Sequence, residues 1–177
     1  MPENPIPELG FRTLLAYWAR RCHGPQLPTR RMLDPVELFE LLPILALVEV
    51  VEGGADFRVR LAGAEIEDRH DMSLRGRSLS DIRKDTEGAD TTDQWGLSVE
   101  TQRPYYRRGP IRFPGNRHYD YSRLILPIAA DEGSRQTVTF LLAGTKMRPI
   151  ARKEFEDGRT VAFQVGDDAI RAALSGG

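Results

Sequence analysis

The sequence predicts one α+β domain built on a five-stranded antiparallel sheet, with short helices on one face and an amphipathic helix ahead of it. Five stretches carry the β-branched or alternating pattern of strands: residues 44–51, 57–61, 104–106, 119–128 and 136–142. Residues 9–22 instead repeat apolar side chains at helical spacing. A length of 177 residues fits one hydrophobic core better than two.

The composition is that of a folded protein outside the membrane. Hydrophobic residues make up 40% of the chain, charged residues 29%, and the formal net charge is -1, so no global charge favours nucleic acid or an anionic membrane. Cys22 is the single cysteine, which excludes an intrachain disulfide and favours a reducing compartment. The N-terminus lacks a signal peptide pattern, and the longest apolar stretch, 41–51, is too short to cross a bilayer. We therefore expect a cytoplasmic protein without a membrane partner.

The helix predicted at 9–22 carries arginines on one face and large apolar side chains on the other, namely Phe11, Leu14, Leu15 and Trp18. Side chains of this size must be buried, and fewer than two heptads cannot form a stable coiled coil alone. We therefore expect the helix to lie on the domain and to contribute these four residues to a homodimer interface. It opens an N-terminal helical flank at 9–43, which follows an N-terminal arm at 1–8.

A short helix and a hairpin follow. Asp34 is placed to cap a helix that ends near Pro43. Residues 53–54 are both glycine and supply the turn between the first two strands. Because arginines alternate with apolar residues in the second strand, its inward face is expected to consist of Phe57, Val59 and Leu61. Gly63 ends the strand where the chain must turn back sharply.

The remaining elements are a helical insertion, three strands and a tail. Residues 64–93 are charged and poor in apolar anchors, which predicts short helical turns. A helix at 91–101 is expected to direct inward Trp95, Val99 and either Leu97 or Ser98. Three antiparallel strands then complete a core at 44–146, and residues 147–177 are expected to form a polar C-terminal tail.

This order of elements, with several local motifs, resembles the PAS domain family and in particular a subfamily of small stand-alone bacterial PAS proteins. The motifs are Tyr17-Trp18, Leu27-Pro28-Thr29-Arg30, Asp34-Pro35, Leu42-Pro43, the run from Phe57 to Gly63, and Gly76-Arg77-Ser78-Leu79. The resemblance covers roughly residues 12–145. It implies a PAS-like five-stranded antiparallel sheet crossed by short helices. It also implies a sensory or protein-interaction role in trans, with a signalling partner protein and, in some members, a small molecule bound between sheet and helices.

The cavity that the resemblance implies would be lined by inward-facing residues of the sheet and the insertion. The candidates are Phe57, Val59, Ile66, Leu79, Ile82, Trp95, Tyr121 and Leu126. Each of them could equally be plain core. Trp95 and Tyr121 are the members that could offer a ligand an N–H or O–H group.

We expect no cofactor. The flavin-binding photosensors of this family carry an Asn-Cys pair in the insertion, whereas residues 64–93 contain neither residue type. A haem needs an axial ligand in an apolar pocket, and the histidine of the insertion, His70, stands between Arg69 and Asp71, as at a solvated helix end. The same neighbourhood holds Glu65 and Glu67, which are typical of a solvated helix face and not of a metal site.

Residues 103–123 carry the strongest local charge signal, with one acid, Asp120, against six arginines: Arg103, Arg107, Arg108, Arg112, Arg117 and Arg123. Guanidinium groups bind phosphates and stack on bases, so the alternative function is an anion-, nucleotide- or RNA-binding module. The competing interpretation is that alternate arginines cover the solvent face of strands whose aromatic residues pack inward. No catalytic motif occurs, so we expect a non-catalytic protein whose partner is not nucleic acid.

Overall fold

A computed structural model describes residues 5–84, 86, 92–131, 133 and 135–176. In chain order, its elements are α1 (Leu9–Ala19), η1 (Arg30–Met32), η2 (Phe39–Ile44), β1 (Leu45–Val51), η3 (Glu52–Gly54), β2 (Asp56–Ala62), α2 (Ala64–His70), α3 (Leu79–Arg83), α4 (Thr92–Thr101), β3 (Tyr105–Phe113), β4 (Arg117–Ala129), β5 (Val138–Pro149), α5 (Arg152–Asp157), β6 (Val161–Gln164) and α6 (Asp167–Ser175). No helix in these ranges combines the length and hydropathy needed to cross a bilayer.

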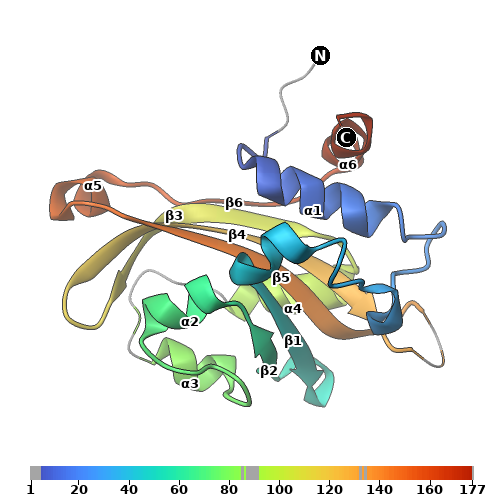
Figure 1. The fold of residues 1–177 in the computed structure, drawn as a ribbon, viewed down its shortest axis with the longest axis horizontal. Coiled ribbons are helices and arrows are strands. Elements are labelled where there is room, and N and C mark those ends of the chain that lie inside the picture. Colours follow the sequence, from blue (N-terminus) through green and yellow to red (C-terminus); the bar gives the residue numbers. More distant parts are fainter. Residues whose placement is uncertain (1–4, 85, 87–91, 132, 134, 177) are drawn as a thin grey trace.

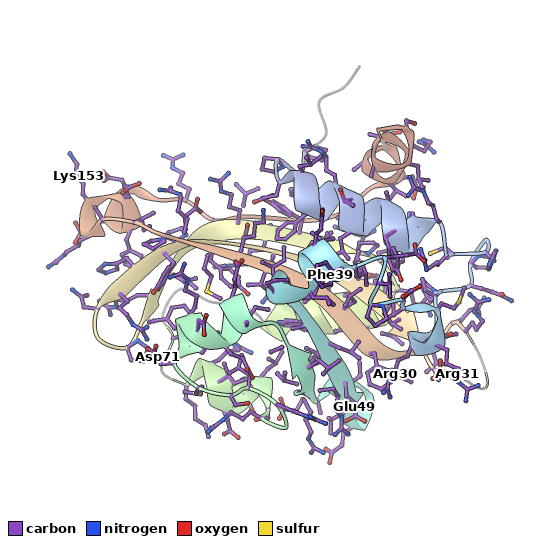
Figure 2. The ribbon with its side chains drawn as sticks, in the orientation of Figure 1. Arg30, Arg31, Phe39, Glu49, Asp71 and Lys153 are labelled. Carbon is purple, nitrogen blue, oxygen red and sulfur yellow. The ribbon has the colours of Figure 1, made fainter. Side chains whose placement is uncertain are left out.

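The strands of the described residues form one six-stranded antiparallel sheet in the order β2-β1-β5-β4-β3-β6. Helices α1 and α6 lie over one face of it, and α2, α3 and α4 lie over the opposite face (Figure 1). We call these the α1 face and the insertion face. Side chains fill the space on both sides of the sheet (Figure 2), so the α+β architecture predicted from sequence is confirmed as a three-layer arrangement.

The predicted strand count of five is wrong by one. Strand β6 pairs with β3 through Tyr105 to Arg108, and it arises within the stretch 147–177 that was expected to be a polar tail. Three of its four residues are exposed, so no alternating apolar pattern marks it in the sequence. Pairing satisfies backbone groups at the edge of β3, and this gain does not depend on side-chain type. Helix α6 then packs Ala169 and Ala173 inward beside α1.

The hairpin of β1 and β2 is confirmed, but one of its predicted inward residues is not. Phe57 and Val59 are buried, whereas Leu61 is 58% exposed. A bulge shifts the register, so that Val48 pairs with Val59 but Leu47 pairs with Leu61. The extra residue in β2 turns Leu61 to the α1 face, because a one-residue slip exchanges the two faces of a strand.

Helix α1 packs on the sheet as expected, and its apolar stripe is enclosed within one chain. Phe11, Leu14 and Leu15 are fully buried and Trp18 is 5% exposed. The Trp18 indole Nε1 donates a hydrogen bond to the carbonyl oxygen of Pro127, 2.8 Å away. These four residues, which were predicted to contact a second copy, have almost no surface left for one in this conformation. Of the arm predicted at 1–8, residues 1–4 lie outside the described residues.

The insertion folds into short helices, as predicted, and residues 85 and 87–91 of it lie outside the described residues. In α4 the choice between Leu97 and Ser98 is decided, because Ser98 is fully buried while Leu97 is 39% exposed. The Ser98 hydroxyl donates to the carbonyl oxygen of Arg103. The prediction that Asp34 caps a helix is wrong: its carboxylate accepts a hydrogen bond from the Val36 N–H within a turn, and the next helix begins only at Phe39. The helix that follows is the 3-10 helix η2.

Two glycines let the layers approach closely. A Cβ at Gly63 would overlap the carbonyl oxygens of Leu42 and Pro43, which confirms the sharp turn expected at this position. A Cβ at Gly144 in β5 would lie 3.0 Å from side-chain carbons of both Phe11 and Leu14. The absence of a side chain at Gly144 therefore sets how closely α1 packs against the sheet.

Trp18→Ala is expected to lower the free energy of unfolding by about 3–5 kcal/mol, because it removes a buried indole and its hydrogen bond. Urea denaturation measures this loss, and Leu9→Ala, at an exposed site of the same helix, is the matched control with an effect within about 0.5 kcal/mol. We expect the oligomeric state in the analytical ultracentrifuge to be the same for wild type and Trp18→Ala. If Trp18→Ala instead is as stable as wild type but dissociates, Trp18 contributes to an interface between copies.

Gly63→Ala and Gly96→Ala are expected to change stability in opposite directions. The first forces a methyl group against two backbone oxygens and should destabilise the fold by about 1–3 kcal/mol. The second meets no atom within 4 Å in helix α4, so the better helix propensity of alanine should stabilise it by up to about 1 kcal/mol. Denaturant titration checks both, and an equal sign for the two changes would contradict the geometry.

Candidate functional site

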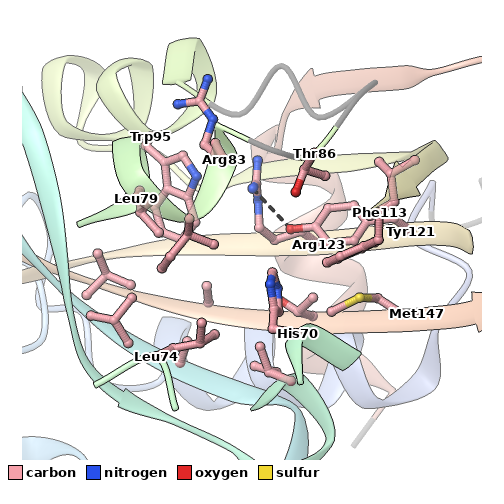
Figure 3. Close-up of a pocket in the computed structure, with 18 residues that line it drawn as sticks. His70, Leu74, Leu79, Arg83, Thr86, Trp95, Phe113, Tyr121, Arg123 and Met147 are labelled. Carbon is pink, nitrogen blue, oxygen red and sulfur yellow. Dashed lines mark hydrogen bonds between the residues drawn. The ribbon is translucent and has the colours of Figure 1, made fainter. Parts of the chain in front are cut away.

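A cavity of about 80 Å³ lies between the insertion face of the sheet and the helices α2, α3 and α4. Its lining is mostly aliphatic and aromatic, with a few polar groups (Figure 3). Six of the eight residues predicted from sequence line it: Val59, Ile66, Leu79, Ile82, Trp95 and Tyr121. A cavity therefore lies between the sheet and the insertion, where the resemblance implied one.

The other two predicted residues lie elsewhere. Phe57 packs behind the wall against Trp95, with 6.0 Å between ring centroids. Leu126 follows Tyr121 by five positions in β4, so its side chain points to the opposite face of the sheet. It shares that face with Leu124, which pairs with Gly144 beneath α1. Counting along the strand would have excluded Leu126.

The polar members of the lining were largely missed by the sequence reasoning. Arg123 is two residues from Tyr121 in β4 and therefore faces the same way. His70 follows Ile66 by four positions in α2 and lies on the same helix face. Both signals were present in the sequence. They were passed over because a charged residue is expected to face water.

His70 is the last residue of α2, but it is half-buried and not solvated, which corrects the expectation from its neighbours. The imidazole contacts Phe113 edge-on, with ring centroids 4.8 Å apart, and reaches the cavity. Helix α2 ends at Asp71, which adopts a left-handed backbone conformation, so the chain turns away while His70 stays inside. Burial, aided by the Arg117 guanidinium and opposed by Asp71, lowers the pKa of His70 to about 4. The ring is therefore neutral near pH 7.

Arg123 places a charged group on the cavity wall. The side chain is 2% exposed, and its Nη1 and Nη2 donate hydrogen bonds to Tyr121 Oη and Gln94 Oε1, at 3.1 and 2.7 Å. Its guanidinium carbon lies 4.7 Å from the centroid of the Trp95 ring. No carboxylate of the described residues forms an ion pair with it. Burial lowers the pKa of Arg123, yet a guanidinium keeps its proton at neutral pH.

The six arginines of 103–123 do not form one surface. Arg107 and Arg123 are buried on the insertion face and lie opposite each other in β3 and β4. The interpretation that alternate arginines are solvent-facing therefore fails for this pair. Three others form ion pairs at 2.7 Å with separate partners: Arg103 with Asp167, Arg108 with Asp120, and Arg117 with Asp71. Arg112 is half-buried near the end of β3.

The acidic residues of α2 have local structural roles. The Glu67 carboxylate accepts hydrogen bonds from the Leu74 N–H and the Ser73 hydroxyl, which lowers the pKa of Glu67. Asp71 pairs with Arg117. Within the described residues, no three histidine, cysteine or acidic side chains gather as a metal site would require. Glu65 and Asp68 are exposed.

Comparison with known proteins supports the same architecture. The family profile described as PAS domain matches residues 9–143, about three quarters of the chain. The chain belongs to the PAS domain family. No curated protein matches it. The narrower resemblance to small stand-alone bacterial members stays a prediction.

Two solved structures are similar to this PAS chain. One is the LOV protein of Rhodobacter sphaeroides, with 13% sequence identity and a TM-score of 0.47 over 71% of this chain and 74% of that chain. The other is a light-oxygen-voltage domain studied with a flavin analogue, with 11% identity and a TM-score of 0.44 over 78% of this chain and 89% of that chain.

The cavity of this PAS domain does not fit a large prosthetic group. At about 80 Å³ it is roughly half the size of an engineered 150 Å³ cavity that holds benzene. Neither a porphyrin nor a flavin ring system can enter this volume without displacing the wall. Cys22 is not among the lining residues, and burial raises the pKa of its thiol to about 11. A thiolate adduct with a bound flavin is therefore not available from this residue.

The fold of this PAS domain should lose stability through His70 as the pH falls from 6.5 to 4. In that window the unfolded imidazole binds a proton that the folded one does not, so the unfolded state is favoured as pH falls. The wild type should lose about 1–3 kcal/mol more than His70→Gln, given about 1.4 kcal/mol per pKa unit. Urea titrations across the window measure the difference, with exposed His23→Gln as control. Parallel pH profiles for wild type and His70→Gln would refute the buried neutral imidazole.

Proposed function

We propose that this chain is a non-catalytic PAS sensory module that binds a small molecule in the cavity between the sheet and α2, α3 and α4. The observation that carries the proposal is the lining of that cavity. It combines apolar walls with a few polar groups, among them Arg123, Tyr121 and His70. Small-molecule sites are built in this way, because apolar walls supply affinity and a few polar groups orient the ligand.

Helix α3, which lies over the cavity, is the element whose arrangement we expect to change when a ligand binds. Helix α3 has five residues, none of them fully buried, and it presents Leu79 and Ile82 to the cavity. Such a short helix has little stability of its own and depends on its tertiary contacts. A ligand that adds contacts to Leu79 and Ile82 favours one arrangement of α3 over others. The outer surface of the insertion then changes with ligand, which is what a partner protein would read.

The alternatives from sequence receive less support. A binding surface for a nucleotide or RNA needs several cationic side chains on one face. Among the arginines of 103–123, two are buried and three form ion pairs with separate partners. An enzyme needs a nucleophile next to a base, and His70 has no hydrogen bond to a described serine, cysteine or acid. We therefore retain the sensory function and propose that nucleic acid is not the partner.

Homodimerisation and a signalling partner remain predictions. The stripe of α1 is buried in its own chain, so a second copy would have to contact exposed apolar residues elsewhere. A groove of about 710 Å³ between η2 and β2 carries such residues, with Phe39 73% and Leu61 58% exposed. Figure 2 shows Phe39 at the surface of η2. Leu61 reaches this groove because of the bulge in the hairpin.

Native mass spectrometry of protein purified from its source is expected to show a retained small molecule. Ala143→Leu should lose it, since Ala143 lines the cavity and a larger side chain fills the void. Ala162→Leu, at an exposed position of β6, is the matched control and should keep the ligand. Absence of added mass in wild type, or equal retention by Ala143→Leu, would count against this cavity as the binding site.

A further inference from the structure

Three side chains of the cavity lining carry buried hydrogen-bond donors that have no acceptor among the described residues. Arg83 Nε, Trp95 Nε1 and Arg123 Nε each lie below the surface with no hydrogen-bond partner. All three residues line the cavity. Figure 3 shows Arg83, Trp95 and Arg123 toward α3 and α4, with His70 on the other side. A buried donor without an acceptor costs free energy, so this grouping calls for an explanation.

The three unpaired atoms are all hydrogen-bond donors, and two of them belong to cationic side chains. Tyr121 Oη accepts from Arg123, so its own proton is free to be donated, and no described acceptor takes it. The nearby acid Asp120 pairs with Arg108 on the other face of the sheet, and Asp71 pairs with Arg117. What the site lacks is an anion with several acceptor lone pairs.

We propose that the ligand of the cavity is a small monocarboxylate, with its carboxylate on Arg123 and a short apolar body against the aliphatic and aromatic wall. This inference rests on the proposed function and names the ligand class. A carboxylate is planar and has acceptors only, so its oxygen can accept a hydrogen bond from the unpaired Nε–H of Arg123. Its single negative charge would balance the positive charge of Arg123, which is buried in the cavity wall.

The other oxyanions fit less well. A phosphate group carries up to two charges and is held by several cations or backbone N–H groups. The sheet residues that line the cavity on the strands next to Arg123 are instead apolar, among them Ile111, Phe113 and Met147. The volume of about 80 Å³ restricts the body to a few carbon atoms, which excludes nucleotides and long fatty acids. Acetate and propionate, which have fewer heavy atoms than benzene, are of the size that the cavity admits.

The test compares each acid with its neutral amide. Binding of acetate and propionate to the purified chain is measured by saturation-transfer NMR at pH 7, beside acetamide and propionamide. The amides keep the shape and carbonyl oxygen but lack the charge. Because hydrogen bonds to an ionised partner are stronger than neutral ones, we expect the acids to bind at least about tenfold more tightly.

Arg123→Met and Arg58→Met separate the site from a general effect of charge. Arg58 is exposed on β2, so Arg58→Met should bind both acids as wild type does. Arg123→Met should lose the preference for acid over amide. Its melting temperature without ligand should not fall, because the substitution removes a buried charge that lacks a counterion. If Arg123→Met does not fold, the acid and amide comparison in wild type still decides.

The outcomes are distinct. Tighter binding of the acids, abolished in Arg123→Met, supports the proposal. Equal binding of acids and amides would overturn the anion assignment while leaving the cavity as a small-molecule site. Absence of binding by all four compounds would overturn the carboxylate proposal, and the proposed function would then fall separately if the native protein also carried no retained molecule.

Discussion

The structure depends on one constraint, which is that both faces of the central sheet are apolar and both must be covered. Strand β4 is buried along most of its length and β5 along its middle, and alternate residues of a strand point to opposite faces of the sheet. On one face Gly144 lets Phe11 and Leu14 of α1 reach the backbone of the sheet, and a groove lies beside them between η2 and β2. On the other face the short helices α2 and α3, with α4, cover the sheet. The cavity lies between these helices and the sheet.

The contribution of a charged side chain to stability depends on whether it lies at the surface or under the helices. Ion pairs such as Arg108 with Asp120 lie at the surface and contribute little to stability. Arg123, by contrast, lies under α4 at a position where an apolar side chain would cost less. Natural sequences keep such locally unfavourable residues mainly where function requires them. The proposed anionic ligand would thus explain why the chain keeps a buried cation on the cavity wall.

His70 and Arg123 divide the cavity into two chemical environments. The imidazole is kept neutral by burial, so it can donate through one nitrogen and accept through the other, while the guanidinium only donates. A ligand with an anionic end and an apolar body would place its charge on Arg123 and an uncharged part near the neutral His70. Occupancy would then stabilise α3 through Leu79 and Ile82, which links recognition to the surface that the insertion presents.

Local patterns in the sequence determined the element types, most strand positions and six lining residues of the cavity, because alternation and helical spacing report directly which side chains share a face. The tertiary structure alone decided three features. The bulge that turns Leu61 outward depends on how β1 and β2 pair, and β6 exists because the edge of β3 was open to a partner of any composition. The burial of Arg123 and His70 follows from what covers them: the sequence places both residues on inward faces, but only the layers above the sheet decide whether that face meets water, a helix or a cavity.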